Sequence, residues 1–410
     1  MNQKRKRILF VTGPVTPLHS TNASLMLRLL SELQHKADCD LLSVGPYSED
    51  GLAVSLEGLD WTKYSTVLDQ AWHGGEYACS AIPIPSTKRF CAIVSERLLD
   101  RKGYQDYRPA VNLRYLIEVL CRQRVYDTVF ASNEPYAAAY ALSQSRIRAA
   151  KALYLIDPFA ELVPLLRDSV PPFRHRTHKK ILEAADLILT TPRTVRALRE
   201  NDYKPYLSKT VAAEFPLFSR LQRTESPDSL RFDPKKINLL YCGWLRNEAC
   251  LRAVVERLDG RFCVTFLGND NAGLRGLQTE AELRTLPAVP REIAVNAILD
   301  ADILLSTGNP YPVHIPSKTF DYLASGKPVV HFYSIPDCPA LEYYQTYPLA
   351  LRIPNDSDAF SAANLAVKFC VENRGKQISF REVCGLYPNI LADDIIKDLI
   401  EIVLSIGDEG

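Results

Sequence analysis

The sequence lacks the cysteine patterns that mark metal sites and disulfide-rich folds. No Cys-x-x-Cys pair occurs, and most cysteines lie within apolar runs such as "LLYCGW" and "FCVTFL". Cysteines in such surroundings behave as small buried hydrophobes. We therefore expect reduced, buried thiols in a chain from a reducing compartment. The cysteines are Cys39, Cys79, Cys91, Cys121, Cys242, Cys250, Cys263, Cys338, Cys370 and Cys384.

A charge excess and long apolar segments are also absent. The 49 Lys and Arg residues balance 48 Asp and Glu residues, so a net charge of +1 does not draw the chain to nucleic acid. No segment approaches the ~18 consecutive apolar residues of a membrane span. The first apolar run, Ile8 to Val11, is too short for a signal peptide. We expect a cytoplasmic protein that binds no nucleic acid and whose electrostatic interactions are local.

The chain does contain a regular alternation of short apolar runs with helical patterns. Runs that are apolar on both faces and alternate with helices are typical of parallel strands covered on both sides. A length of 410 residues suits two domains. The expected strands are 7–13, 39–45, 126–132, 151–157 and 186–191, then 237–243, 262–268, 301–307 and 328–333, with helices over 21–36, 135–150, 247–258, 291–300 and 390–405.

A polar, proline-containing stretch, 221–236, separates the two series and is the predicted linker. We predict an α/β fold of two tandem Rossmann-like domains, 1–220 and 237–390, each a doubly wound parallel sheet. The remaining 391–410 forms a C-terminal helix that can cross back to the first domain. Ligands of such sheets bind outside the carboxyl ends of the strands, and two facing domains form a cleft there.

Two of the loops after strands carry weak signals. The first, "TGPVTPLHSTNASL", contains Gly13 but no Gly-x-Gly-x-x-Gly motif, so a dinucleotide fingerprint is absent. This loop either caps the next helix or presents helical N–H groups to an anionic or hydroxyl-rich ligand. In "LLYCGWLRNEA", Arg246 follows a strand of the second domain and either lies in solvent or binds phosphate oxygens.

The most informative stretch is "HIPSKTFDYLASGKPVVHF", residues 314–332. A helix begins at Pro316 or Ser317, and Gly-Lys-Pro ends it. Lys318 adds a positive charge at the helix N-terminus, where exposed N–H groups form an anion site. Asp321 lies one turn further on nearly the same face, so it can accept hydrogen bonds from hydroxyls beside the anion. The alternative is an exposed i,i+3 ion pair of about 0.3 kcal/mol.

This stretch is similar to the donor-site signature of GT-B glycosyltransferases in the family 4 group, in which Pro-Ser-Lys-x-Phe-Glu-Tyr-x-x-x-Gly-Lys-Pro carries the nucleotide-sugar contacts. The likeness extends over most of the chain. "YDTVFASNEPYAAAYAL", "ALYLIDPF" and "ILEAADLILTTPRTVRAL" resemble the acceptor domain, while "LLYCGWL", "VTFLGND" and "VPREIAVNAILDADILLST" resemble the nucleotide-binding domain. The resemblance implies a GT-B fold and retaining sugar transfer from a UDP- or GDP-type donor, without a divalent metal or other cofactor.

The resemblance also assigns residues to the donor. Asp321 takes the place of the family's glutamate that binds the ribose hydroxyls, and backbone near Val289 frames the base. The other implied donor contacts are Gly13, Arg246, Ser317, Lys318 and Thr319.

Three departures from the family pattern affect this assignment. The full motif is Glu-x7-Glu, and Val313 stands where the first glutamate belongs, so Asn309 or His314 is the candidate to replace it. Asp321 is one methylene shorter than the family's glutamate, and the first loop lacks the paired glycines. The departures bear on the mechanism and leave the predicted fold unchanged.

Two features lie in the expected acceptor domain. Asp157 in "LIDPF" ends a strand, where it either orients the acceptor or caps the following turn. His175-x-x-His178 has no third metal ligand nearby, so we predict no metal site. The basic residues around it indicate either a solvated helix start or a surface for an anionic lipid-linked acceptor or a membrane. They are Arg174, Arg176, Lys179 and Lys180.

The leading hypothesis is a hexosyltransferase-type glycosyltransferase that moves a sugar from a nucleotide-diphosphate donor to a polysaccharide, glycolipid or other surface-glycan acceptor. Such an enzyme works in the cytoplasm or at the inner face of the membrane. The first alternative is a non-catalytic GT-B accessory or scaffold subunit, because the first glutamate is missing. The second is a sugar-nucleotide epimerase on the same fold.

Overall fold

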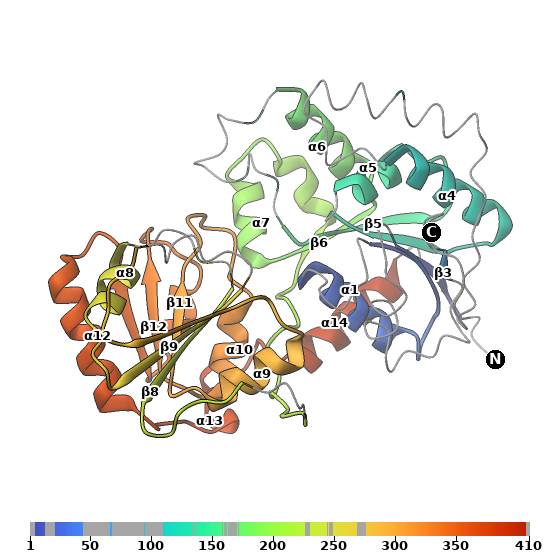
Figure 1. Cartoon of the computed structure of the whole chain (residues 1–410). Coiled ribbons are helices and arrows are strands. Elements are labelled where there is room, and N and C mark those ends of the chain that lie inside the picture. The colour runs from blue at the N-terminus through green and yellow to red at the C-terminus, as the bar shows by residue number, and fades with distance from the viewer. Residues whose placement is uncertain are drawn as a thin grey trace. The chain divides into compact units, whose positions relative to one another are not determined.

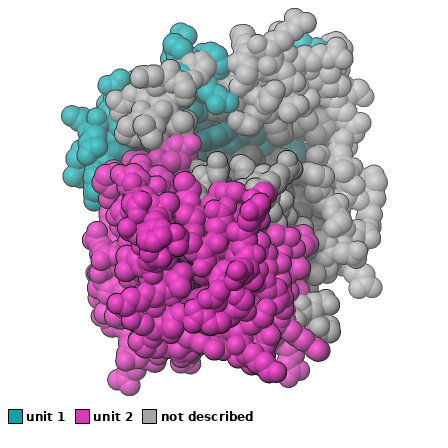
Figure 2. Space-filling view, turned by 60° about the vertical axis from the view of Figure 1, so that its left-hand side comes forward, with its two compact units in different colours: residues 1–215, 394–410 teal, residues 216–393 magenta. Residues whose placement is uncertain are grey.

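The computed structural model contains two compact α/β units (Figure 1). The first comprises Met1–Phe215 together with Asp394–Gly410, and the second comprises Pro216–Asp393 (Figure 2). The stretch 221–236, predicted as a linker, lies near the start of the second unit. The residues that the structure describes are 5–12, 21–43, 66–67, 94, 110–133, 136–157, 159, 162, 170, 172–225, 230–243, 245, 249–268 and 276–406.

The described strands of the first unit form a seven-stranded parallel sheet in the order β3-β2-β1-β4-β5-β6-β7. Because β1 pairs with both β2 and β4, the chain reverses its direction across the sheet after β3. The strands are β1 Arg7–Thr12, β2 Asp38–Ser43, β3 Thr66–Val67, β4 Thr128–Ser132, β5 Ala150–Leu155, β6 Leu187–Thr190 and β7 Thr210–Ala212.

Helices of the first unit bury the apolar residues of this sheet. α4 and α5 pack side by side and cover the face that carries Leu9, Val11 and Val129 (Figure 1). At the C-terminus, Lys6 Nζ donates to the carbonyl oxygens of Leu404 and Ile406, which ties that segment to this unit. The helices are α1 Thr21–Leu33, α4 Ala110–Gln123, α5 Tyr136–Gln144, α6 Pro172–Ala184, α7 Pro192–Arg199, the 3-10 helix η5 Lys204–Lys209 and α14 Ala392–Ser405.

The second unit is built on a six-stranded parallel sheet in the order β10-β9-β8-β11-β12-β13. Both faces of β8 are buried along its whole length, as expected for a central strand covered by helices on both sides. The strands are β8 Ile237–Cys242, β9 Phe262–Leu267, β10 Glu282–Leu286, β11 Ile303–Thr307, β12 Val329–Tyr333 and β13 Ala350–Pro354.

Two separate cores lie on the two faces of this second sheet. α9, α10, α11 and α13 pack on one face, and α8 and α12 pack on the other (Figure 1). The two layers of helices match the predicted doubly wound architecture. The helices are α8 Ala249–Glu256, α9 Arg291–Asp300, α10 Lys318–Ser325, α11 Leu341–Tyr344, α12 Ala359–Asn373 and α13 Phe380–Leu386.

Every strand expected from the apolar runs is present, with ends that differ by at most two residues. The eight described cysteines are free thiols, and all of these except Cys121 and Cys384 are buried; Cys79 and Cys91 lie outside the described residues. Among the described helices, none combines the length and the apolar character that crossing a membrane requires.

Candidate functional site

The second unit has a topological switch point at the carboxyl ends of β8 and β11. β8 pairs with β9 on one side and with β11 on the other, so the chain winds outward from β8 in both directions. Ligands of doubly wound sheets bind at such a point. The hydroxyls of Tyr241 and Thr307 lie 3.0 Å apart and join the two strand ends by a hydrogen bond.

Glycines allow the backbone to approach closely at this edge. Gly243 follows β8 with a φ of 136°, a conformation that other residues rarely adopt. A Cβ on Gly268, which follows β9, would lie 2.0 Å from the carbonyl oxygen of Gly243. Glycine at position 268 is therefore required for the contact between these two strand ends.

Helix α10 begins at the same edge of the sheet. Ser317 is its N-cap, and Gly326 ends it in the left-handed conformation, with a φ of 71°. This confirms that the helix ends at Gly-Lys-Pro. The hydroxyl of Tyr322 accepts a hydrogen bond from Cys242 N at 3.0 Å and so fixes the helix against the end of β8. The N-terminus of α10 is thereby held close to the switch point.

The three residues predicted to bind the diphosphate differ in what they can offer a ligand. Thr319 N donates to Pro316 O at 2.9 Å, and the Thr319 side chain is buried, so this residue faces the protein. Ser317 and Lys318 are half-buried. Both side chains can therefore contact a ligand, and Lys318 brings a positive charge to this helix N-terminus.

Asp321 is a buried carboxylate with two cationic partners. Its side chain is only 6% exposed, and both of its oxygens accept hydrogen bonds from Arg291, at 2.7 and 3.2 Å. Lys318 Nζ lies 3.5 Å from Asp321 Oδ2. The burial excludes the alternative of an exposed i,i+3 pair and places the carboxylate one turn inside the helix, as the spacing predicts.

Arg291 is the residue of this cluster that sequence reasoning missed. It is the first residue of α9, in "VPREI", and reaches Asp321 across 30 positions of sequence. The negative charge of Asp321 is the main cause that raises the pKa of Arg291. The one sequence signal was an arginine at a helix start after a strand, which does not reveal its partner.

A row of buried polar groups lies beneath the loop that joins β11 to α10. His331 Nδ1 lies 3.0 Å from Ser306 Oγ, and His331 Nε2 lies 3.6 Å from Cys338 Sγ. Burial lowers the pKa of His331 to about 3, so its imidazole is neutral at physiological pH. A Cβ on Gly308, the first residue after β11, would lie 2.6 Å from Cys338 Sγ. These contacts fix where the loop leaves the sheet.

The loop itself contains the two residues proposed to replace the missing glutamate. Asn309 Nδ2 donates to His314 O at 3.0 Å, so this side chain holds the loop closed on itself. His314 N donates to Tyr311 O, and the two rings meet edge to face. Val313, at the position of the family's first glutamate, is 9% exposed. Val289 is partly buried against the core that includes α10.

In the first unit, Asp157 is half-buried just after β5. Asn133, fully buried after β4, donates to Asp157 O and accepts from Ile156 N at 2.8 Å. The Asn133 amide therefore fixes the position of the backbone at Ile156 and Asp157. Gly13 and Arg246, also predicted as site residues, lie outside the described residues.

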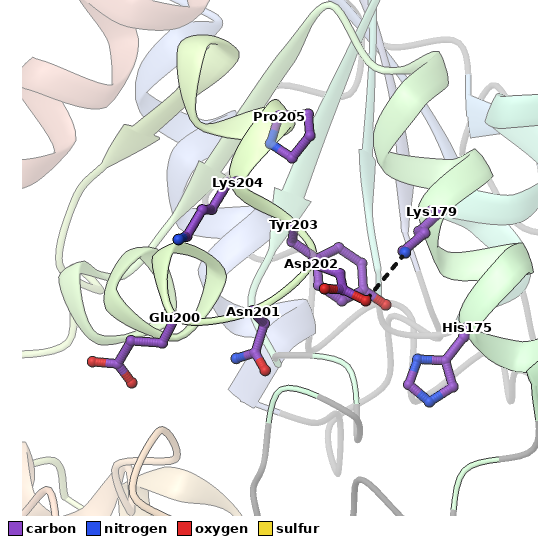
Figure 3. Close-up of a pocket in the computed structure, with 8 residues that line it drawn as sticks. All are labelled: His175, Lys179, Glu200, Asn201, Asp202, Tyr203, Lys204 and Pro205. Carbon is purple, nitrogen blue, oxygen red and sulfur yellow. Dashed lines mark ion pairs between the residues drawn. The ribbon is translucent and has the colours of Figure 1, made fainter.

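The two histidines of the basic stretch have different surroundings. His178 is buried and stacks on Phe159 with ring centroids 3.9 Å apart, so it is a packing residue. His175 lines a polar pocket of about 620 Å³ with Lys179 and the residues 200–205 (Figure 3). Lys179 forms an ion pair with Asp202 at 3.7 Å, so an acidic residue of the same pocket balances the positive charge of Lys179. Among the residues that the structure describes, no cluster of His, Cys, Asp or Glu could hold a metal ion.

Comparison of the whole fold with solved structures shows extensive similarity, although no protein-family model and no curated protein matches the sequence. Sucrose-phosphate synthase from Thermosynechococcus elongatus has a TM-score of 0.62 at 13% identity, covering 99% of this chain and 100% of its own. Anabaena HepE in complex with UDP and glucose has a TM-score of 0.59 at 12% identity, with 97% and 99% coverage. A UDP-N-acetylglucosamine 2-epimerase has a TM-score of 0.52 at 12% identity, with 93% and 94% coverage.

The similarity covers nearly the whole of each chain and so includes both units. At 12–13% identity, this similarity is evidence for a shared fold. Two parallel doubly wound sheets in one chain, matched along their length by the solved structures of sucrose-phosphate synthase and HepE, confirm the architecture predicted from the motifs. The chain therefore has the GT-B fold, made of two Rossmann-like units.

Proposed function

We propose that the chain is a nucleotide-sugar-dependent glycosyltransferase. The observation that carries this proposal is the buried Asp321, held with Lys318 and Arg291 at the N-terminus of α10 beside the switch point. A carboxylate that can accept ribose hydroxyls next to cations that can neutralise phosphate matches the two polar parts of a nucleoside diphosphate.

Each residue then has a defined task. Lys318, Ser317 and the N–H groups at the start of α10 hold the diphosphate, with Arg246 as a further phosphate ligand. Stabilising the negative charge that develops on the leaving diphosphate lowers the barrier to transfer. Because cationic side chains and a helix N-terminus neutralise that charge, we propose that transfer needs no metal ion. Retention of the anomeric configuration is proposed from the resemblance to the family 4 group, as is the position of Val289 beside the base. Asp321 binds the ribose.

On the acceptor side, Asp157 orients the acceptor hydroxyl, and Asn309 or His314 contacts the transferred sugar. The acceptor is a polysaccharide, glycolipid or other surface glycan. Arg176 and Lys180, both exposed on α6, can attract an anionic lipid-linked acceptor or the inner face of a membrane. This places the protein in the cytoplasm, either free or peripheral to the membrane.

Two structural neighbours support a sugar-nucleotide substrate. HepE was solved in complex with UDP and glucose, and sucrose-phosphate synthase is named for the synthesis of a phosphorylated sugar. The shared fold makes the same class of donor the first to test here.

The test is the binding of UDP and GDP to the whole protein by isothermal titration calorimetry. We expect Lys318→Ala and Asp321→Ala to weaken binding roughly 10-fold or more, because each removes a charged hydrogen-bonding partner. Asp321→Asn keeps the size of the side chain and should show the same direction. The matched controls are Lys397→Ala and Asp394→Ala, which break an exposed i,i+3 Lys–Asp pair elsewhere. Equal affinities for all these variants and the wild type would contradict the assignment of this site to the donor.

A second candidate function is sugar-nucleotide epimerisation, favoured by the similarity to a UDP-N-acetylglucosamine 2-epimerase. It predicts a new sugar nucleotide when the protein meets a donor without any acceptor. A non-catalytic accessory subunit is the third, favoured by Val313 in place of an acidic residue. It predicts donor binding without hydrolysis, transfer or epimerisation. Chromatography of the sugar nucleotides after incubation, with and without glycan acceptors, separates the three.

A further inference from the structure

Arg291 is hydrogen-bonded to Asp321, the carboxylate that the proposed function assigns to binding the ribose. Its two terminal nitrogens reach both oxygens of Asp321, and the Arg291 side chain is 54% exposed while the Asp321 side chain is 6% exposed. The guanidinium therefore lies between the buried carboxylate and solvent. A ribose can reach Asp321 only after Arg291 has moved.

A guanidinium and a pair of adjacent hydroxyls present the same hydrogen-bonding face. Each offers two donors side by side to the two oxygens of one carboxylate. The 2′ and 3′ hydroxyls of a ribose can therefore replace the Arg291 nitrogens without leaving the buried charge unpaired. Lys318, 3.5 Å from Asp321 Oδ2, stays as a cationic partner during the exchange.

We propose that Arg291 is an exchangeable partner of Asp321, which covers the carboxylate in the free protein and moves to a phosphate of a bound ribonucleoside diphosphate. The inference rests on the proposed function, because it requires a nucleoside diphosphate at the N-terminus of α10. The guanidinium stays charged at every relevant pH, so it needs a new anionic partner when it leaves Asp321. A phosphate group supplies that partner with the same forked geometry.

This exchange makes Arg291 a specificity-determining residue. A ribonucleoside diphosphate satisfies both Asp321 and the displaced Arg291. A 2′-deoxyribonucleoside diphosphate leaves one carboxylate oxygen without its donor, and a nucleoside leaves Arg291 without its anion. The deoxy ligand loses a hydrogen bond to the buried carboxylate, and the nucleoside displaces Arg291 from its ion pair without replacing it, so both should bind more weakly.

The exchange predicts opposite effects of one substitution on two ligands. In Arg291→Ala the ribose no longer competes for Asp321, so uridine or guanosine should bind about threefold more tightly or better. The phosphate has lost its partner, so UDP or GDP should bind roughly 10-fold more weakly. Arg291→Lys keeps the charge but loses the fork, so it should bind nucleosides more tightly than the wild type and diphosphates more tightly than Arg291→Ala.

The experiment is a titration of the whole protein with uridine, guanosine, UDP, GDP and the 2′-deoxy forms of the two diphosphates, with nucleosides also measured by competition against the diphosphate. The matched control is Arg223→Ala, since Arg223 makes a bidentate pair with Asp300 in the same unit and is 56% exposed. Thermal unfolding of each variant establishes that it is folded. If Arg291→Ala does not fold, Arg291→Lys gives the same comparison.

Three results overturn the inference while leaving donor binding intact. The first is a parallel change of nucleoside and diphosphate affinity in the Arg291 variants, the second is no tighter nucleoside binding, and the third is equal binding of ribose and 2′-deoxyribose diphosphates. Wild-type protein that binds neither UDP nor GDP overturns the proposed function and the inference together.

Discussion

At the scale of single residues, the carboxylate of Asp321 lies between Lys318, on the same helix, and Arg291, at the start of another helix. The i,i+3 spacing of Lys318 and Asp321 placed both side chains on one face of α10, because a helical turn fixes that geometry. The pairing of Asp321 with Arg291 joins the starts of two helices, and no periodicity in the sequence reports it. Local spacing can also mislead: Thr319 was predicted to face the ligand, but its side chain is fully buried.

His331 gives a residue-scale prediction about pH. Its pKa falls from 6.5 to about 3 on folding because burial disfavours the charged form. Between these values the unfolded chain binds a proton at this position and the folded chain does not. The free energy of unfolding therefore falls as the pH drops below 6.5, by up to about 1.4 kcal/mol per pH unit from this group alone, and levels off near pH 3.

The measurement is urea unfolding from pH 7 to pH 4 for the wild type and for His331→Gln, which keeps an amide for hydrogen bonding. We expect the wild type to lose stability relative to the variant as the pH falls, since carboxylates contribute equally to both. His35→Gln, at an exposed histidine, is the control and should follow the wild type. Parallel curves for wild type and His331→Gln would contradict a buried neutral imidazole.

At the scale of elements, the strands with continuous apolar runs were predictable, whereas the edge strands were not. β10 lies at one edge of its sheet, and its side chains are half-buried or exposed, so "ELRTL" carries no strong strand signal. β13, at the other edge, ends in Pro354, which is tolerated there because an edge strand need not donate every N–H. Central strands such as β8 are buried on both faces, and this burial explains why their sequences are continuous apolar runs.

The end of α10 gives an element-scale prediction with an internal control. Gly326 and Gly375 both have a φ of 71°, so alanine at either position incurs the cost of a left-handed residue, about 1–2 kcal/mol. A Cβ at Gly326 would also lie 1.9 Å from Ile378 O, whereas a Cβ at Gly375 meets nothing within 4 Å.

Gly326→Ala should therefore lower the free energy of unfolding by roughly 1–3 kcal/mol more than Gly375→Ala does, because backbone must shift to relieve the contact. Urea unfolding of the two variants measures the difference. The same loss for both would mean that the approach of Ile378 O to the end of α10 does not constrain the protein in solution.

At the scale of the whole molecule, the alternation of strands and helices was enough to predict two doubly wound sheets. Each βα repeat is a local pattern, and parallel strands joined by helices have one favoured handedness, so few topologies remain. The predicted placement of the ligand at the carboxyl ends follows from the same rule. What the alternation cannot supply is the assignment of the last helix, because an amphipathic helix can bury its apolar face against either unit.

The C-terminal segment gives the prediction at this scale. Its apolar side chains Ile395, Leu399 and Val403 are buried, and Lys6 Nζ binds the carbonyl oxygens of Leu404 and Ile406 beside β1. Deleting Asp394–Gly410 removes this burial from the first unit, at about 2 kcal/mol for each large apolar side chain.

Hydrogen exchange measured by mass spectrometry should then show faster exchange in β1 and β2 of the truncated chain, with β8 and β11 unchanged. Lys6→Ala removes the two hydrogen bonds but leaves the apolar burial, so its effect should lie in the same strands and be smaller. Faster exchange confined to the second unit would instead assign the segment to that unit. The C-terminal helix would then stabilise the unit that contains Lys318 and Asp321.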